Sequence, residues 1–312
     1  MNLKLLIVLN FGTAKPTASH MVLNKNFMYY LVQKMDLVVT SSSGIGNRLR
    51  VMFSFVHLCY KNYNINNLHF IWEKNRECNG FFEDCFESPQ LNWIHVNKTY
   101  SSFVDIKTNF HISDKIPSWV PFVFPFSDAV KQKAYEIINT IGDDFLGIHL
   151  RKTDRKESDK VMQYKAPFLQ MNDDDYFLKI PDNTNKPIYL PTDNIETQRK
   201  FQKKFGERCY INKNIQDTKE LRKSELFDAA VDMFICSEAS EFYGSFRSSF
   251  SEIVKAFRDA KVYDMVELDS TEYMSDAWDV YYQDANKEIK KKEPKGFQNL
   301  KKNKRVYKML YE

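Results

Sequence analysis

The chain has 312 residues, of which 43% are hydrophobic and 15% aromatic, and it carries 45 Lys and Arg against 41 Asp and Glu. This composition excludes a disordered chain, and the length allows one large domain or two of moderate size. The near balance of charge gives a nucleic-acid binder no support by itself.

Basic residues gather near the C-terminus, at 290–292 and 301–305. Such runs could contact nucleic acid or an anionic membrane, but we favour a solvated terminal helix or tail. We therefore expect no nucleic-acid partner and no stable membrane anchor.

The N-terminus carries a short apolar run, Leu5–Leu9. The run falls short of the roughly 20 residues that span a bilayer, and it makes a poor signal peptide. Ser19-His20-Met21 resembles a junction left by cloning, so we set residues 1–20 aside. Because we predict neither a membrane anchor nor a secretion signal, we expect a cytoplasmic location. Five cysteines without CxxC spacing predict free thiols, although Cys78 and Cys85 are close enough in sequence to pair in an oxidising compartment.

An alternation of strands and helices begins at residue 35. Apolar residues predict a buried strand at 35–40, then a Ser/Gly turn and a helix at 47–60 with apolar residues at helical spacing. Two further strands are predicted at 68–72 and 93–96. This order predicts an α/β unit.

Three prolines, at 117, 121 and 125, predict a junction between this unit and a second one. In the second unit we predict, in chain order, a helix at 129–141, strands at 145–150 and 188–190, helices at 196–205 and 225–236, a strand at 241–243 and a helix at 251–259. We thus expect an α/β fold with two open α/β domains facing each other. Its parts are an N-terminal extension at 1–34, domains at 35–130 and 131–266, and a helical, basic tail at 267–312.

The segment Gly147-Ile-His-Leu-Arg-Lys-Thr-Asp154 is an apolar strand that ends abruptly in polar residues. Arg151 offers a planar fork for bidentate phosphate binding, and Lys152 adds a point charge. These residues at a strand's carboxyl end suit a diphosphate. A structural cluster of ion pairs is the alternative.

Gly44-Ile-Gly-Asn-Arg-Leu49 follows the first strand and opens a helix. Glycines there let backbone N–H groups and the helix N-terminus approach an anion or a sugar hydroxyl. The segment is neither the dinucleotide fingerprint GxGxxG nor a Walker A loop. The alternative is a tight strand-to-helix connection.

Two weaker signals follow in the second unit. Thr192 and Asp193 end the strand at 188–190, and Asp232 precedes the hydroxyl-rich turn 244–251. Ser248, Ser249 and the first amides of the following helix could bind phosphate. An ordinary helix cap, with the helix starting at Ser251, is the alternative.

Taken in order, GxGNRL, HxRxTD, a Thr-Asp pair after a strand and an SSFS turn resemble the fucosyltransferase superfamily. The nearest branches are the bacterial nodulation and animal α1,6-fucosyltransferases, with the protein O-fucosyltransferases more distant. Trp72 and segment 78–86 resemble the family's N-terminal domain. The resemblance spans about residues 35–262. It implies a GT-B-like architecture, in which two Rossmann-like domains face each other across a cleft that holds GDP-fucose and the second domain binds this donor. It also implies a glycan acceptor and no cofactor besides this donor.

The resemblance also implies roles for particular residues. Arg151 of HxR would bind the donor's diphosphate and be required for activity, whereas Lys152 stands where the family usually has Arg. The family's Thr-Asp pair near guanine and ribose corresponds to Thr192 and Asp193, its later aspartate to Asp232, and its phosphate-side serine to Ser248 or Ser249. Through the same motifs, Gly46, Asn47, Arg48 and His149 are candidates for donor binding.

Inverting transfer needs a base opposite the leaving group. Asp154 is our catalytic candidate beside Arg151, with Glu157 and Asp159 as alternatives. Asp173–Asp175 could form a metal-binding DxD, but a solvated loop is the interpretation that we favour, so we expect metal-independent catalysis. The remaining alternatives are transfer of another sugar, a non-catalytic glycan- or nucleotide-binding module, and a nucleic-acid binder that uses the basic tail.

Overall fold

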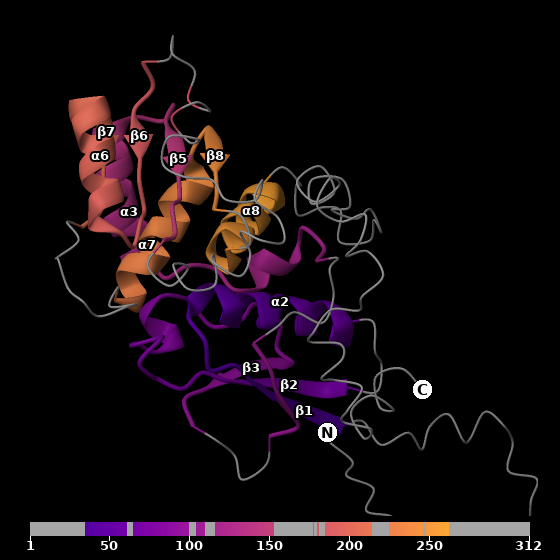
Figure 1. Ribbon diagram of the computed structural model, residues 1–312. Coiled ribbons are helices and arrows are strands. Elements are labelled where there is room, and N and C mark those ends of the chain that lie inside the picture. The colour runs from indigo at the N-terminus through magenta and orange to yellow at the C-terminus, as the bar shows by residue number, and fades with distance from the viewer. Residues whose placement is uncertain are drawn as a thin grey trace, which may run out of the picture. The chain divides into compact units, whose positions relative to one another are not determined.

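The computed structural model describes residues 35–60, 65–99, 104–109, 116–152, 177, 180, 185–213, 225–245 and 248–261 (Figure 1). The predicted extension at 1–34 and tail at 267–312 lie outside these residues. So do Asp154, Glu157, Asp159 and the Asp173–Asp175 run.

The first sheet has four parallel strands in the order β3-β2-β1-β4. Their bounds are β1 Met35–Thr40, β2 Ile65–Ile71, β3 Ile94–Asn97 and β4 Ile106–Lys107. Helix α2, Ile45–Tyr60, connects β1 to β2. Leu37 and Val39 are buried at alternate positions of β1, as a strand with one face toward a helix requires.

The second sheet repeats this arrangement, with four parallel strands in the order β7-β6-β5-β8. Its strands are β5 Leu146–Ile148, β6 Ile188–Tyr189, β7 Cys209–Tyr210 and β8 Glu241–Tyr243. The associated helices are α3 Asp128–Ile141, α6 Ile195–Phe205, α7 Leu226–Glu238 and α8 Ser249–Lys261. Short 3₁₀ helices lie at η2 Phe82–Asp84, η3 Val120–Val123 and η5 Gly206–Arg208.

Local sequence explains where two of these helices begin and end. Ser127 caps α3 by accepting a hydrogen bond from Val130 N, and Asn194 caps α6 by accepting one from Thr197 N at 2.9 Å. Both helices end at a glycine with positive φ, Gly142 at 90° and Gly206 at 58°, a conformation that other residues adopt at a cost.

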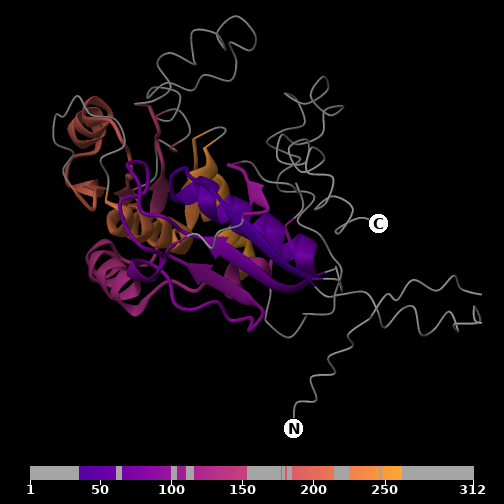
Figure 2. The same cartoon turned by 90° about the horizontal axis from the view of Figure 1, so that it is seen from below.

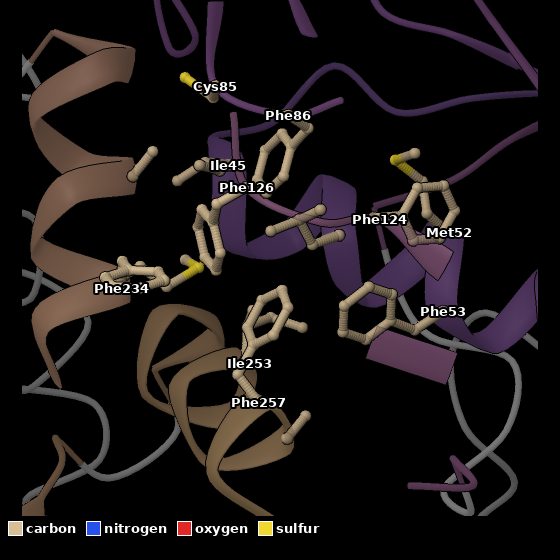
Figure 3. Close-up of a cluster of buried hydrophobic side chains, with 14 of the residues drawn as sticks. Ile45, Met52, Phe53, Cys85, Phe86, Phe124, Phe126, Phe234, Ile253 and Phe257 are labelled. Carbon is tan, nitrogen blue, oxygen red and sulfur yellow. The ribbon is translucent and has the colours of Figure 1, made fainter. Parts of the chain in front are cut away.

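One hydrophobic core runs through both halves of the chain. Figure 3 shows Phe53 of α2 and Phe257 of α8 in a common cluster with Phe124, Phe126 and Phe234. The rings of Phe53 and Phe257 meet edge to face at 5.8 Å between centroids. Helix α2 therefore packs on α8 as well as on its own sheet, as Figures 1 and 2 show. The boundary that we predict near residue 130 falls within this continuous core, and the division into domains stays a prediction.

A smaller cluster lies on the other face of the second sheet, under α6. It comprises Leu146, Ile148, Leu150, Ile180, Ile188, Leu190 and Phe201. The two clusters together bury both faces of the second sheet, as is usual for parallel strands.

The predicted α/β class is confirmed, with two four-stranded parallel sheets. The GT-B-like arrangement of two domains across a cleft stays a prediction. The strands and helices predicted between residues 35 and 266 are present, with ends shifted by a few residues. The prediction lacked β4 and β7, each only two residues long. Among the helices that the structure describes, none combines the length and apolar character that crossing a membrane demands.

Candidate functional site

Apart from Asp232, the predicted motifs lie close to where parallel strands end. Beyond β5 and β6, a single bridge continues the pairing from Leu150 to Thr192, and Leu150 N donates to Pro191 O at 3.1 Å. On the other side, His149 N donates to Tyr243 O of β8 at 3.0 Å. The segment that carries Arg151 is thus held between its two neighbours at the carboxyl edge of the sheet, where ligands of such sheets bind.

Ser245 fixes the backbone at Arg151. Its buried hydroxyl accepts a hydrogen bond from Arg151 N at 2.8 Å and donates one to His149 O at 3.0 Å. The carbonyl of Ser245 also accepts from Ser248 N at 3.2 Å. One residue therefore connects the end of β5 to the start of α8. Sequence reasoning missed Ser245, although the hydroxyl-rich turn 244–251 was the signal that could have found it.

His149 is buried and held by the same segment. Its Nδ1 lies 2.8 Å from Ser251 Oγ, and its ring stacks on Phe250 at 4.4 Å between centroids. Ser251 comes so close to the chain at Gly244 that a Cβ built there would lie 2.6 Å from Ser251 Cβ. A glycine is required at this contact, and the imidazole has a fixed orientation.

Ser248 immediately precedes α8 and is fully buried, yet its hydroxyl makes no hydrogen bond within the described part of the chain. A buried polar group without a partner costs about 1–3 kcal/mol. Ser248 O accepts the first hydrogen bond of the helix, from Glu252 N at 2.9 Å. The helix thus begins at Ser249, two residues before the predicted start, and the unpaired hydroxyl lies at its N-terminus.

Gly46 brings a second helix N-terminus to the same place. A Cβ built on Gly46 would lie 2.6 Å from Phe250 N and 2.7 Å from Ser249 C, so only glycine permits this approach. The N-terminal turns of α2 and α8 are therefore in direct contact. Each helix N-terminus carries a partial positive charge of about +0.5 from its unpaired amides. Together with the Ser248 hydroxyl, they form a site suited to an anion.

Asn47 lies in the first turn of α2, beside Gly46, and Arg50 fixes its orientation. Arg50 Nη2 donates to Asn47 Oδ1 at 2.7 Å, and Arg50 Nη1 donates to Glu252 Oε2 of α8 at 2.9 Å. These contacts connect the two helix N-termini through side chains as well as through backbone packing.

Arg48 has different surroundings from its neighbour Asn47. Its side chain is only 2% exposed, lies over the Trp72 ring at 4.9 Å and donates through Nε to Ser43 O at 2.6 Å. Burial lowers the pKa of its guanidinium. Arg48 therefore connects the loop before α2 to Trp72. Its role in donor binding stays a prediction.

Lys152 and Asp193 are brought together because they follow β5 and β6, which are neighbours in the sheet. Lys152 N donates to Asp193 Oδ1 at 2.7 Å, and Thr192 Oγ1 accepts from Asn194 N at 3.3 Å. The exposed Asp193 thus lies beside the residue that follows Arg151.

Asp232 occupies a different layer, in the middle of α7. Tyr189 of β6 donates its hydroxyl hydrogen to Asp232 Oδ1 at 2.5 Å. The surrounding apolar core raises the pKa of Asp232 to about 7, and the nearby charge of Asp228 adds to the rise. The described contacts place Asp232 between helix and sheet rather than beside Arg151 or Ser248.

No metal centre accompanies these groups within the described ranges, because no three His, Cys, Asp or Glu residues there are arranged to hold an ion. The chemistry available from this part of the chain is hydrogen bonding and positive charge. The N-termini of α2 and α8 are in contact, and the end of β5 is connected to the start of α8 through Ser245.

Comparison with models of known protein families finds one match. The family model of the GDP-fucose protein O-fucosyltransferases matches residues 74–261, which is more than half of the chain. This is the branch that we expected to be the more distant one. No curated protein matches the chain.

Several solved structures are similar at low identity. NodZ α1,6-fucosyltransferase co-crystallised with GDP has 10% identity and a TM-score of 0.48, with 71% of this chain and 92% of that chain covered. Fucosyltransferase NodZ from Bradyrhizobium has 9% identity and a TM-score of 0.48, with 71% and 93% covered. POFUT1 in complex with GDP has 12% identity and a TM-score of 0.41, with 73% and 95% covered.

Proposed function

Since the chain belongs to the GDP-fucose protein O-fucosyltransferase family and is a glycosyltransferase, we propose that it transfers fucose from GDP-fucose to a hydroxyl of an acceptor. The observation that carries the proposal is the unpaired, buried hydroxyl of Ser248 at the meeting point of two helix N-termini. We propose that the diphosphate of the donor binds there.

Three kinds of group support this diphosphate site. The first amides of α2 and α8 supply N–H donors and partial positive charge. Ser248 supplies a hydroxyl, and of the two serines that the sequence left open we choose it, since Ser249 packs against Gly46. Arg151 supplies a full charge, and its backbone is tied through Ser245 to Ser248. A planar guanidinium is the side chain best matched to phosphate oxygens.

The same groups would act in the transfer step. The acceptor oxygen attacks C1 of fucose, the bond from C1 to the β-phosphate oxygen breaks, and GDP leaves with the bonding electrons. Negative charge grows on the β-phosphate as this bond breaks, and preorganised donors and cations stabilise it. Attack from the opposite face inverts the configuration and needs a base for the acceptor proton. We propose Asp154 as this base, with Glu157 and Asp159 as the alternatives.

We propose that the reaction needs no metal ion. Helix N-termini and Arg151 supply the positive charge that a divalent cation supplies in other transferases. Activity should therefore survive dialysis against a chelator. A stoichiometric requirement for Mn²⁺ or Mg²⁺ would contradict this and would direct attention to Asp173–Asp175.

We propose that a carboxylate of this chain recognises the guanine base by hydrogen bonding. A carboxylate can accept hydrogen bonds from the N1–H and N2 amine of guanine, which uracil and adenine do not present together. We propose this role for Asp193, which follows β6, with Thr192 nearby. Asp232, in the middle of α7, is the second candidate and would have to exchange its hydrogen bond from Tyr189 for one from the base. The cost of an unpaired buried polar group, about 1–3 kcal/mol, corresponds to about 5- to 150-fold in affinity.

Calorimetry with GDP, UDP and ADP tests the proposal. GDP should bind at least about fivefold more tightly than UDP or ADP. Asp193→Ala should reduce this difference in affinity. Any reduction in Asp232→Asn would measure the contribution of the second carboxylate. Equal binding of GDP and UDP would leave a phosphate site but contradict the proposed donor.

The acceptor that we propose is a glycan. The family's description names protein O-fucosylation, so a peptide with Ser and Thr hydroxyls is the second acceptor to test. GDP release from GDP-fucose, compared with release from other nucleotide sugars, separates a fucosyltransferase from a transferase for another sugar. GDP binding without turnover of any donor would instead favour a non-catalytic module. We propose a cytoplasmic location, which the five free cysteine thiols support.

A further inference from the structure

Arg50 determines which end of the Asn47 amide is available to a ligand. A guanidinium only donates hydrogen bonds, so the group that faces Arg50 Nη2 at 2.7 Å is the amide oxygen of Asn47. The NH₂ group is consequently turned away from Arg50. It makes no hydrogen bond in the part of the chain that the structure describes, and it is not fully buried.

Glu252 keeps Arg50 in this orientation. Its carboxylate accepts from Arg50 Nη1 at 2.9 Å, and the two side chains are only 15% and 14% exposed. Arg50 Nη2 also reaches Asn109 O at 3.3 Å. A planar fork bound on both sides cannot rotate to release Asn47 without breaking the partly buried pair with Glu252.

Asn47 lies where an anion is favoured. It follows Gly46 in the first turn of α2, and Gly46 is packed against the N-terminus of α8. An amide oxygen facing a phosphate there would repel it, whereas an N–H donor would bind it. Arg50, one helical turn away on α2, and Glu252 on α8 together hold the Asn47 amide so that its N–H groups can face an anion.

We propose that Arg50 is a positioning residue that turns the Asn47 amide so that its NH₂ group donates to the β-phosphate of the nucleotide. This inference rests on the proposed diphosphate site and adds a specific contact to it. Glu252 is the anchor of the arrangement, so that the contact is available only when α2 and α8 are packed together.

Asn47→Asp is the sharpest test, because aspartate retains the acceptor that Arg50 needs and removes the N–H donor. The melting temperature should stay the same or rise, since the new carboxylate pairs with Arg50. Affinity for GDP should fall at least about tenfold, while affinity for GMP, which lacks the β-phosphate, should change less than about twofold. Unchanged GDP affinity, or equal losses for GDP and GMP, would overturn the proposal.

A double-mutant cycle tests the dependence of Asn47 on Arg50. Arg50→Lys keeps a cation near Glu252 but cannot hold both partners in a fork. In the parent background it should weaken GDP binding by about 5- to 50-fold, and in an Asn47→Ala background it should have no further effect. Additive losses would show that Arg50 acts independently of Asn47 and would overturn the positioning role.

The parent protein serves as the reference that separates the two proposals. If the parent fails to bind GDP more tightly than GMP, the diphosphate site itself is refuted, and the positioning role with it. If the parent binds GDP more tightly than GMP, and Asn47→Asp keeps the same ratio of the two affinities, only the positioning role is refuted. Should Arg50→Lys fold poorly, the Asn47→Asp comparison decides alone.

Discussion

Gly46 of α2 lies against Ser249 of α8 so closely that a Cβ on Gly46 would be 2.8 Å from Ser249 Oγ and 2.7 Å from Ser249 C. The two residues are about 200 positions apart in the chain, and their helices are associated with the two different sheets. Their contact brings two helix N-termini to one point, and the proposed diphosphate site depends on it.

Gly46→Ala should therefore separate the two helix N-termini. The methyl group would overlap backbone atoms of α8 that cannot rotate away, and overpacking of this kind costs about 1–3 kcal/mol. This exceeds the gain of about 0.5–1 kcal/mol from replacing a helical glycine by alanine. We expect a lower melting temperature and a loss of GDP affinity, measured by thermal unfolding and calorimetry.

Gly44→Ala, two residues earlier and just before α2, is the matched control, because a Cβ there would meet only Glu77 O at an ordinary 3.4 Å. It should bind GDP within about threefold of the parent. If both glycine variants behave alike, the close packing at Gly46 does not support the site.

Ser248→Ala should act in opposite directions on stability and on binding. Removing a buried hydroxyl that has no partner should leave the unliganded protein equally stable or slightly more stable. Loss of a hydrogen bond to a charged phosphate, about 1.5–3 kcal/mol, should weaken GDP binding by about 10- to 150-fold. A variant that loses stability and keeps its GDP affinity would show that the hydroxyl has a structural partner and no ligand.

Asp232 should make the free energy of unfolding depend on pH. Its pKa is about 7 in the folded protein against an ordinary value of 3.8, so the folded state holds this proton more tightly than the unfolded state does. Stability from this residue is therefore present at pH 4 and is lost as the pH rises to about 7, by about 1.4 kcal/mol for each unit of the shift.

Asp232→Asn is the control for this titration, since its amide oxygen can still accept from Tyr189. The free energy of unfolding of both proteins can be measured with urea at pH 5 and pH 8. Relative to the parent, the variant should be more stable at pH 8 than it is at pH 5. Equal changes in the two proteins would place the titrating group elsewhere.

Sequence patterns were sufficient for the main elements of the fold. β1 contains the apolar run Leu37–Val39, β5 lies in an apolar run, and α2 has apolar residues at helical spacing, so hydrophobic burial specifies them. β4 and β7 are two residues long and carry no periodic signal. α8 begins two residues early because serines at 248, 249 and 251 are all suitable near a helix start, and only its packing on Gly46 selects among them.

From the sequence, the site could be predicted only as a set of polar residues that follow strand ends. Arg151 and Asp193 follow adjacent parallel strands, so their proximity is a consequence of topology. Ser245 contacts Arg151 across 94 positions, and Arg50 contacts Glu252 across 202. Such contacts depend on how α2 and α8 pack, which residue spacing does not encode. Asp232 is a similar case, because its titration is set by the core around Tyr189.

The most direct test of the account is the release of GDP from GDP-fucose by the parent protein and by Arg151→Ala. The account predicts that the parent releases GDP and that the variant, folded by circular dichroism, is slower by a factor of about 10²–10³, as for loss of one preorganised charge. A variant within about threefold of the parent, or a parent that neither binds GDP nor releases it, would contradict the assignment of the diphosphate site and of the fucosyl transfer.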